Sequence, residues 1–118
     1  MKEMTFLRSL IEKTKANKLD WNSLINDLSP NIIYQFIRDD ISTLKDGYYC
    51  EFGNKSIVIY IKEGSSSPQL ALASRDFILE YEFDFEELSA PGELWRLFKL
   101  IQRKTHNVDK FIDEFTKE

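Results

Sequence analysis

The sequence has one cysteine, one histidine, three prolines and four glycines among its 118 residues. The single cysteine, Cys50, excludes an internal disulfide and favours a reducing, cytoplasmic setting. One cysteine and one histidine cannot supply the four ligands of a structural zinc site. Neither a G-x-G-x-x-G loop nor a Walker sequence is present, so the phosphate-binding loops of nucleotide-dependent enzymes are missing. We therefore predict no metal and no cofactor.

Long hydrophobic runs are also missing. No apolar segment approaches the roughly 20 residues that a membrane-spanning helix requires. Charged residues interrupt the first eight positions, so the hydrophobic core of a signal peptide is not found there. We expect a soluble, cytoplasmic protein with no membrane partner.

The composition is that of a folded protein. Hydrophobic residues make up 42% of the chain and aromatic residues 14%, which is too apolar for a disordered segment. A length of 118 residues is typical of one domain, which we assign to residues 1–118. The net charge of -4 favours solubility and argues against a general affinity for nucleic-acid backbones.

Apolar residues at helical spacing predict two helices in the first part of the chain. The first spans residues 4–17, where apolar side chains recur every three or four positions. The second begins after Asp20, a capping residue, and continues to residue 28 with Trp21 on its buried side.

A third helix is predicted after Ser29 and Pro30, which combine a capping hydroxyl with a first-turn proline. Its apolar positions continue to Leu44. A strand over residues 31–38 stays open as an alternative, because this segment is rich in β-branched and aromatic residues.

The hydrophobic period changes to two after Gly47. Turn residues at 53–54 and at 75–76 each join two strands, so we predict two strand pairs, which are connected by a loop at residues 64–68. In the fourth strand, apolar and acidic residues alternate, which predicts a sheet with one buried face and one face in water. The predicted strands cover residues 48–52, 56–62, 69–74 and 77–84. The apolar positions of the fourth strand are Phe77, Leu79, Tyr81, Phe83 and Phe85.

Two helices are predicted at the C-terminal end. The first begins near Pro91 and continues to Lys104, and the second follows Asn107, which we interpret as its cap. The last helix has one apolar stripe, made of Val108, Phe111, Ile112 and Phe115. Helices and strands are segregated along the chain, which is typical of an α+β fold. We predict N-terminal helices, a four-stranded antiparallel meander and two C-terminal helices packed on one sheet face.

Three carboxylates, Glu80, Glu82 and Asp84, occupy alternate positions of the fourth strand. This spacing places neighbouring carboxylates about 7 Å apart on one face. The simplest interpretation is a solvated sheet face whose charge discourages edge pairing. A protein-binding acidic surface, including one that imitates a nucleic-acid backbone, is the second interpretation, and a magnesium site is the third.

Three cations, Arg96, Lys99 and Arg103, lie opposite the apolar side of the helix that follows Pro91. Such a row can follow a phosphate backbone or dock an acidic partner. It is also the ordinary polar side of an amphipathic helix. His106 follows this helix, and we interpret it and Cys50 as structural residues without a catalytic role.

Both ends of the chain resemble small uncharacterised proteins of Gram-positive bacteria and their phages or mobile elements. The resemblance rests on 10–15 (LIEKTK), 19–21 (LDW), 94–98 (LWRLF) and 107–115 (NVDKFIDEF). It implies a short cytoplasmic protein that binds another macromolecule, and it transfers no site residues.

These observations favour a non-enzymatic protein-binding module, including an inhibitor or immunity-type protein acting on a nuclease or toxin. The predicted contact residues are Glu80, Glu82, Asp84, Arg96, Lys99 and Arg103. The alternative is a nucleic-acid-binding regulator that uses the basic helix face, and a hydrolase using the carboxylates ranks third. A homodimer through surplus aromatic residues such as Tyr49, Tyr60 or Trp95 also stays open.

Overall fold

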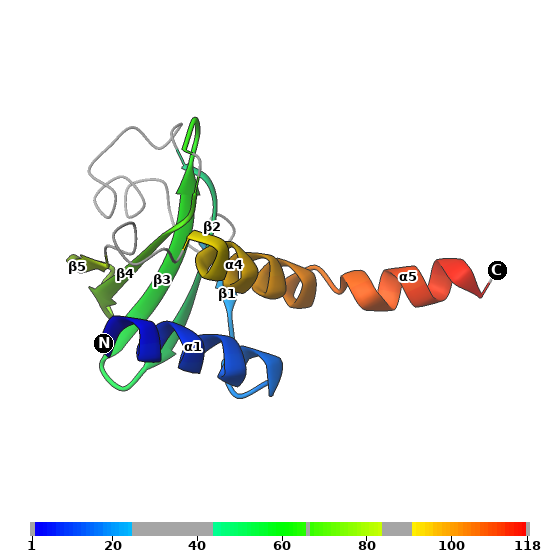
Figure 1. Ribbon diagram of the computed structural model, residues 1–118, viewed down its shortest axis with the longest axis horizontal. Coiled ribbons are helices and arrows are strands. Elements are labelled where there is room, and N and C mark those ends of the chain that lie inside the picture. The colour runs from blue at the N-terminus through cyan, green and yellow to red at the C-terminus, as the bar shows by residue number, and fades with distance from the viewer. Residues whose placement is uncertain (1, 25–43, 66, 84–90, 118) are drawn as a thin grey trace.

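The computed structural model describes residues 2–24, 44–65, 67–83 and 91–117, and it has an α+β fold (Figure 1). The described helices are α1 (Lys2–Lys15), α4 (Pro91–Thr105) and α5 (Val108–Thr116). The described strands are β1 (Asn22–Ser23), β2 (Leu44–Phe52), β3 (Lys55–Lys62), β4 (Gln69–Ser74) and β5 (Leu79–Phe83).

The strands form one antiparallel sheet in the order β1-β2-β3-β4-β5. The predicted meander is confirmed, but the described residues form five strands of the sheet where four were predicted. The turn at Gly53 joins β2 to β3, and its φ of 61° is a conformation that glycine adopts readily. The Arg75 side chain donates hydrogen bonds to the Gly53 carbonyl oxygen, so the two hairpin turns are joined at one end of the sheet.

The extra strand lies within the second predicted helix. Asn22 and Ser23 pair with Tyr49 and Tyr48 of β2 as an edge strand, so the prediction of a helix from Asp20 onward is wrong at this point. The indole of Trp21 donates a hydrogen bond to Thr14 Oγ1 at 3.0 Å, which binds the segment before β1 to α1. The predicted third helix lies mostly in residues 25–43, outside the described residues, as does the helix-or-strand alternative for 31–38; its last position, Leu44, belongs to β2.

Helices α1 and α4 cover the same face of the sheet and pack against each other (Figure 1). This part of the predicted architecture is confirmed. The cluster between these helices and the sheet contains helix residues spaced three or four apart and alternate residues of the strands. These spacings follow from the 3.6-residue period of a helix and the two-residue period of a strand. Its buried members are Leu7, Leu10, Ile11, Trp21, Tyr48, Cys50, Ile57, Ile59, Ile61, Leu70, Leu94, Leu97, Phe98 and Ile101.

The opposite face of the sheet is also buried, and the prediction of a single buried face is wrong. Every residue of β3 from Ser56 to Ile61 is buried, so its side chains are covered on both sides. A strand with apolar residues at consecutive positions is typical of a sheet covered on both faces. The second cluster contains Leu24, Leu44, Val58, Tyr60, Ala71 and Ala73.

A bulge divides the alternating pattern of β5. Leu72 pairs with Tyr81 and Ala73 pairs with Leu79, so Glu80 is an extra residue between two registered pairs. An extra residue in a strand moves the side chains before it to the opposite face of the sheet. Leu79 therefore packs against the second cluster, while Phe83 packs against the first. The prediction that all the apolar residues of this strand point one way is therefore wrong.

Helix α5 does not pack on the sheet. It contains no buried residue and extends from the end of α4 away from the body of the molecule (Figure 1). The predicted packing of both C-terminal helices on one sheet face is therefore correct for α4 and wrong for α5.

Candidate protein-docking surfaces

The apolar stripe of α5 is exposed. The stripe consists of Val108, Phe111, Ile112 and Phe115, which we call the α5 stripe. The exposed fractions of its three large side chains are 67% for Phe111, 45% for Ile112 and 74% for Phe115. The two phenylalanine rings stack on each other with centroids 6.4 Å apart. Scattered exposed apolar residues are common, whereas a continuous exposed row marks a contact surface.

The junction between α4 and α5 gives the last helix its direction. Asn107 has φ 51° and ψ 43°, in the left-handed region that asparagine tolerates better than most residues. Its side chain makes no capping hydrogen bond, so the predicted capping role is wrong although the helix begins at the predicted position. Beyond the turn, Arg103 Nε donates a hydrogen bond to Asp109 Oδ1 at 3.0 Å and binds the two helices together.

The predicted acidic surface is partly engaged within the sheet. Glu80 forms an ion pair with Lys55, and Glu82 accepts a hydrogen bond from the buried Tyr60. Asp84 lies outside the described residues. The bulge at Glu80 also interrupts the regular two-residue spacing on which the predicted acidic face depends.

The predicted basic surface is exposed, but its three cations differ in their surroundings. Arg103 is bonded to Asp109, and Lys99 Nζ lies 5.9 Å from the centre of the Trp95 ring. Arg96 is exposed and makes no ion pair with any described carboxylate. The structure does not bring this row together with the acidic residues of β5 in any described contact.

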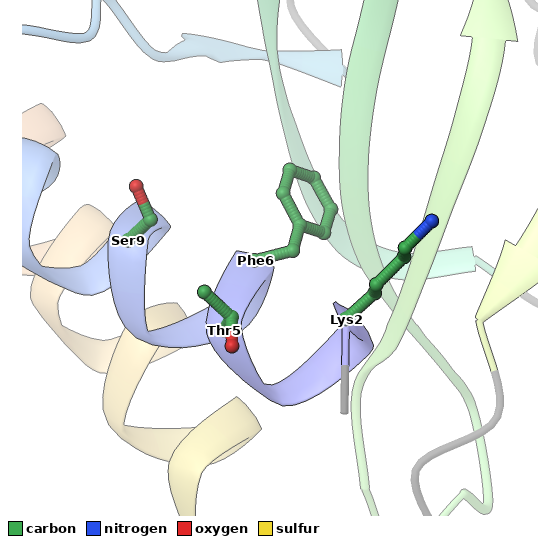
Figure 2. Close-up of a pocket in the computed structure, with 4 residues that line it drawn as sticks. All are labelled: Lys2, Thr5, Phe6 and Ser9. Atoms are coloured by element: carbon green, nitrogen blue, oxygen red, sulfur yellow. The ribbon is translucent and has the colours of Figure 1, made fainter.

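A second apolar surface lies along α1. Shallow hollows meet around Phe6, which points from α1 toward the strands together with Lys2 (Figure 2). One hollow, of about 170 Å³, continues over Leu19 and Phe52, and another continues over Leu72 and Phe83. We call this surface the α1 groove. Its lining residues are Lys2, Glu3, Thr5, Phe6, Ser9, Leu10, Lys13, Leu19, Phe52, Ile57, Leu72 and Phe83.

The α1 groove was not among the predicted surfaces. The spacing of Lys2, Phe6, Ser9 and Lys13 places them on one stripe of a helix, and this was the available signal. The rest of the lining comes from residues far apart in sequence, which only the tertiary fold brings together. Periodicity indicated Phe6 as a core residue, and it is partly buried against the first cluster.

Polar residues meet where the end of α4 contacts β2. The Tyr48 hydroxyl and the Gln102 amide each donate a hydrogen bond of 3.1 Å to Asp46 Oδ2. His106 Nε2 lies 3.1 Å from the same hydroxyl. Burial, followed by the Asp46 charge, raises the pKa of Tyr48, so its hydroxyl stays protonated. This cluster orients the end of α4 from which α5 extends.

The surplus aromatic residues that suggested a dimer patch have other surroundings. Tyr60 is fully buried, so it is not part of an exposed patch. Tyr49 packs edge-on against Phe77, and half-buried Trp95 packs edge-on against Phe98. Within the described part of the chain, the large exposed aromatic side chains are Phe52, Tyr81, Phe111 and Phe115.

Other features of the described residues concern metal ligation, membrane crossing and thiol reactivity. Among the described residues, no group of three histidine, cysteine or acidic side chains could hold a metal ion. None of the helices in that part of the chain is long and apolar enough to cross a membrane. Burial, with a smaller contribution from Asp20, raises the pKa of Cys50 to about 12.

Comparison of the chain with protein-family models, with curated proteins and with solved structures found no match.

Proposed function

We propose that this protein is a non-enzymatic protein-binding module whose docking element is α5. The observation that carries the proposal is the α5 stripe, which its own chain leaves exposed. Spacing of i, i+3, i+4 and i+7 is the pattern by which an amphipathic helix enters a partner's hydrophobic groove.

The energetics support a helix that is completed by a partner. A helix of nine residues is marginal in water on its own, because nucleation is costly and few hydrogen bonds follow it. Burying a phenylalanine or isoleucine side chain contributes about 1.5–3 kcal/mol. Docking of the α5 stripe would therefore both stabilise the helix and supply the free energy of binding.

Charged residues around α5 and α4 fit this role. Asp109 and Glu114 flank the stripe on its two sides, while Arg96 and Lys99 present cations on the preceding helix. Such charges steer association and exclude wrong partners more than they add affinity.

The proposal can be tested by placing a photo-crosslinking benzophenone amino acid on α5. Position 111 lies on the stripe, and position 110 lies on the opposite side of the same helix. We expect discrete protein adducts in cells of the native host from position 111 and none from position 110. Equal labelling from both positions, or no adduct from position 111, would contradict the proposal.

A further inference from the structure

We propose that the α5 stripe of one copy docks in the α1 groove of a second copy, and that two such contacts close a symmetric dimer. This inference rests on the proposed function and names the partner of the stripe. Each copy carries one projecting helix and one groove, so a two-fold axis satisfies both at once.

The dimensions of the two surfaces match. At 1.5 Å per residue, the stripe from Val108 to Phe115 is about 10 Å long. The α1 side of the groove, from Lys2 to Lys13, is about 16 Å long by the same rise. Phe6 lies between these lysines and lines each of the three hollows that make up the groove. The groove is therefore long enough to receive the whole stripe over an apolar floor.

The charges at the edges are complementary. Helix α5 carries three carboxylates and one lysine. Lys2 and Lys13, both exposed, stand near the two ends of the groove, where Glu3 is the one acid of its lining. Lys13 Nζ already lies 5.8 Å from the centre of the Phe52 ring, so a cation borders the aromatic end of the groove. Because Asp109 is bonded to Arg103, we expect Glu114 to be the carboxylate that meets these lysines.

The area available fits a reversible contact. A phenylalanine buries about 150–250 Å² in full, and Phe111 and Phe115 are 67% and 74% exposed, so the four rings of two copies would bury about 400–700 Å² on docking. The groove surfaces beneath them add a similar area, which brings the total to about 800–1,400 Å², at the lower end of specific interfaces.

The helix is poorly placed to occupy the groove of its own chain. Lys104 Nζ donates a hydrogen bond to Asn17 Oδ1, so α4 ends beside the far end of α1, and α5 extends outward from there (Figure 1). Only His106 and Asn107 connect the two helices. Docking within one chain would reverse the turn at Asn107 and break the bond between Arg103 and Asp109.

Sedimentation equilibrium of the full chain tests the inference. We expect a reversible dimer, and we expect Phe111→Glu with Phe115→Glu to raise its dissociation constant at least a hundredfold. Lys110→Glu, which places a carboxylate on the opposite side of α5, should leave the dimer intact. In the groove, Ser9→Glu should also dissociate the dimer, whereas Ser9→Ala should not. Thr5→Glu, at an exposed position of the same groove, is a second groove variant in case Ser9→Glu lowers the melting temperature.

Mixing the variants identifies the contact. The stripe variant keeps an intact groove and the groove variant keeps an intact helix, so an equimolar mixture should form a heterodimer although each alone is monomeric. A wild-type protein that stays monomeric up to about 1 mM, where association is barely favourable, would overturn the inference. A dimer that survives both Ser9→Glu and Thr5→Glu but not the stripe variant would also overturn it, because α5 would then pack on α5.

The two proposals fail differently. A monomeric protein that still crosslinks to another protein from position 111 overturns the dimer and keeps the proposed function. A monomer with no such adduct overturns both.

Discussion

Arg103 donates two hydrogen bonds to a single carboxylate oxygen of Asp109, and this contact joins the last turn of α4 to the first turn of α5. Because Arg103 is paired in this way, it is less available as part of the predicted basic surface. For the same reason, Asp109 is less available beside the α5 stripe. This exposed ion pair therefore favours the projecting direction of α5 without fixing it.

The ion pair between Arg103 and Asp109 predicts that the stability of the α4–α5 junction depends on pH. The hydrogen bond from Arg103 holds the pKa of the Asp109 carboxyl below its ordinary 3.8. A folded-state pKa that is lowered stabilises the junction above the ordinary value, and this stabilisation is lost as pH falls through the lowered one. Carboxyl NMR titration of Asp109 should show a lower pKa in the wild type than in Arg103→Gln. Identical titration curves in the two proteins would contradict the contact in solution.

A side chain at Gly47 is predicted to be destabilising. A Cβ at this position would lie 2.7 Å from Leu24 Cδ1 and 3.1 Å from Tyr60 Cβ. Overpacking of this kind costs about 1–3 kcal/mol, so Gly47→Ala should lower the free energy of unfolding by that amount in a denaturant titration.

The control for this substitution is Gly92→Ala in the first turn of α4. A Cβ at Gly92 meets nothing within 4 Å, and alanine is the better helix former. We expect this variant to be as stable as the wild type or slightly more stable. Equal losses in the two variants would contradict the close packing at Gly47.

The thiol of Cys50 should be inert in the native protein. The side chain is fully buried in the first cluster, and its pKa of about 12 leaves almost no thiolate at pH 8. A disulfide reagent at pH 8 should react only at the rate of unfolding, and at once in denaturant. Fast stoichiometric labelling of the folded protein would show that the cluster opens locally.

The basic face of α4 is predicted not to bind nucleic acid. The chain has a net charge of -4, and one of the three cations is bonded to Asp109. In a low-salt mobility-shift experiment, neither DNA nor RNA should be retarded. A shift that weakens with salt and is lost in Arg96→Glu with Lys99→Glu would instead support the nucleic-acid-binding alternative.

The same double variant should leave stability almost unchanged, since substitution of exposed charged side chains usually changes stability by no more than about 0.5 kcal/mol. A denaturant titration of the double variant checks this expectation. A larger loss of stability would show that Arg96 or Lys99 contributes to the fold.

Local patterns predicted the elements whose neighbours are close in sequence. The α4 helix, the hairpins about Gly53 and Arg75 and the antiparallel meander were predicted because their spacing and turn residues are local signals. The second buried face was missed although consecutive apolar residues in β3 indicate a strand covered on both sides. The bulge at Glu80 was missed because one extra residue in a ladder leaves no mark on an alternating pattern.

In the candidate site, too, features with a local sequence signal were predicted and features that depend on the tertiary fold were missed. Periodicity predicted the α5 stripe residue by residue, but a stripe does not indicate which surface covers it. Packing on the sheet was the default expectation, and the left-handed turn at Asn107 directs the helix elsewhere. The α1 groove depends on Phe52, Leu72 and Phe83, which come from three strands and converge only in the folded chain.

Amide hydrogen exchange of the intact protein at several concentrations tests most directly whether the α5 stripe is covered by another molecule. In dilute solution, we expect amides of residues 112–116 to exchange within the dead time, because an uncovered nine-residue helix frays. As the protein concentration rises, the amides of residues 112–116 should become protected. The amides in the exposed first turns of α1 should become protected in parallel. Strong protection of α5 at every dilution would show that the helix is covered by its own chain, and it would contradict the proposal that α5 is covered by another molecule.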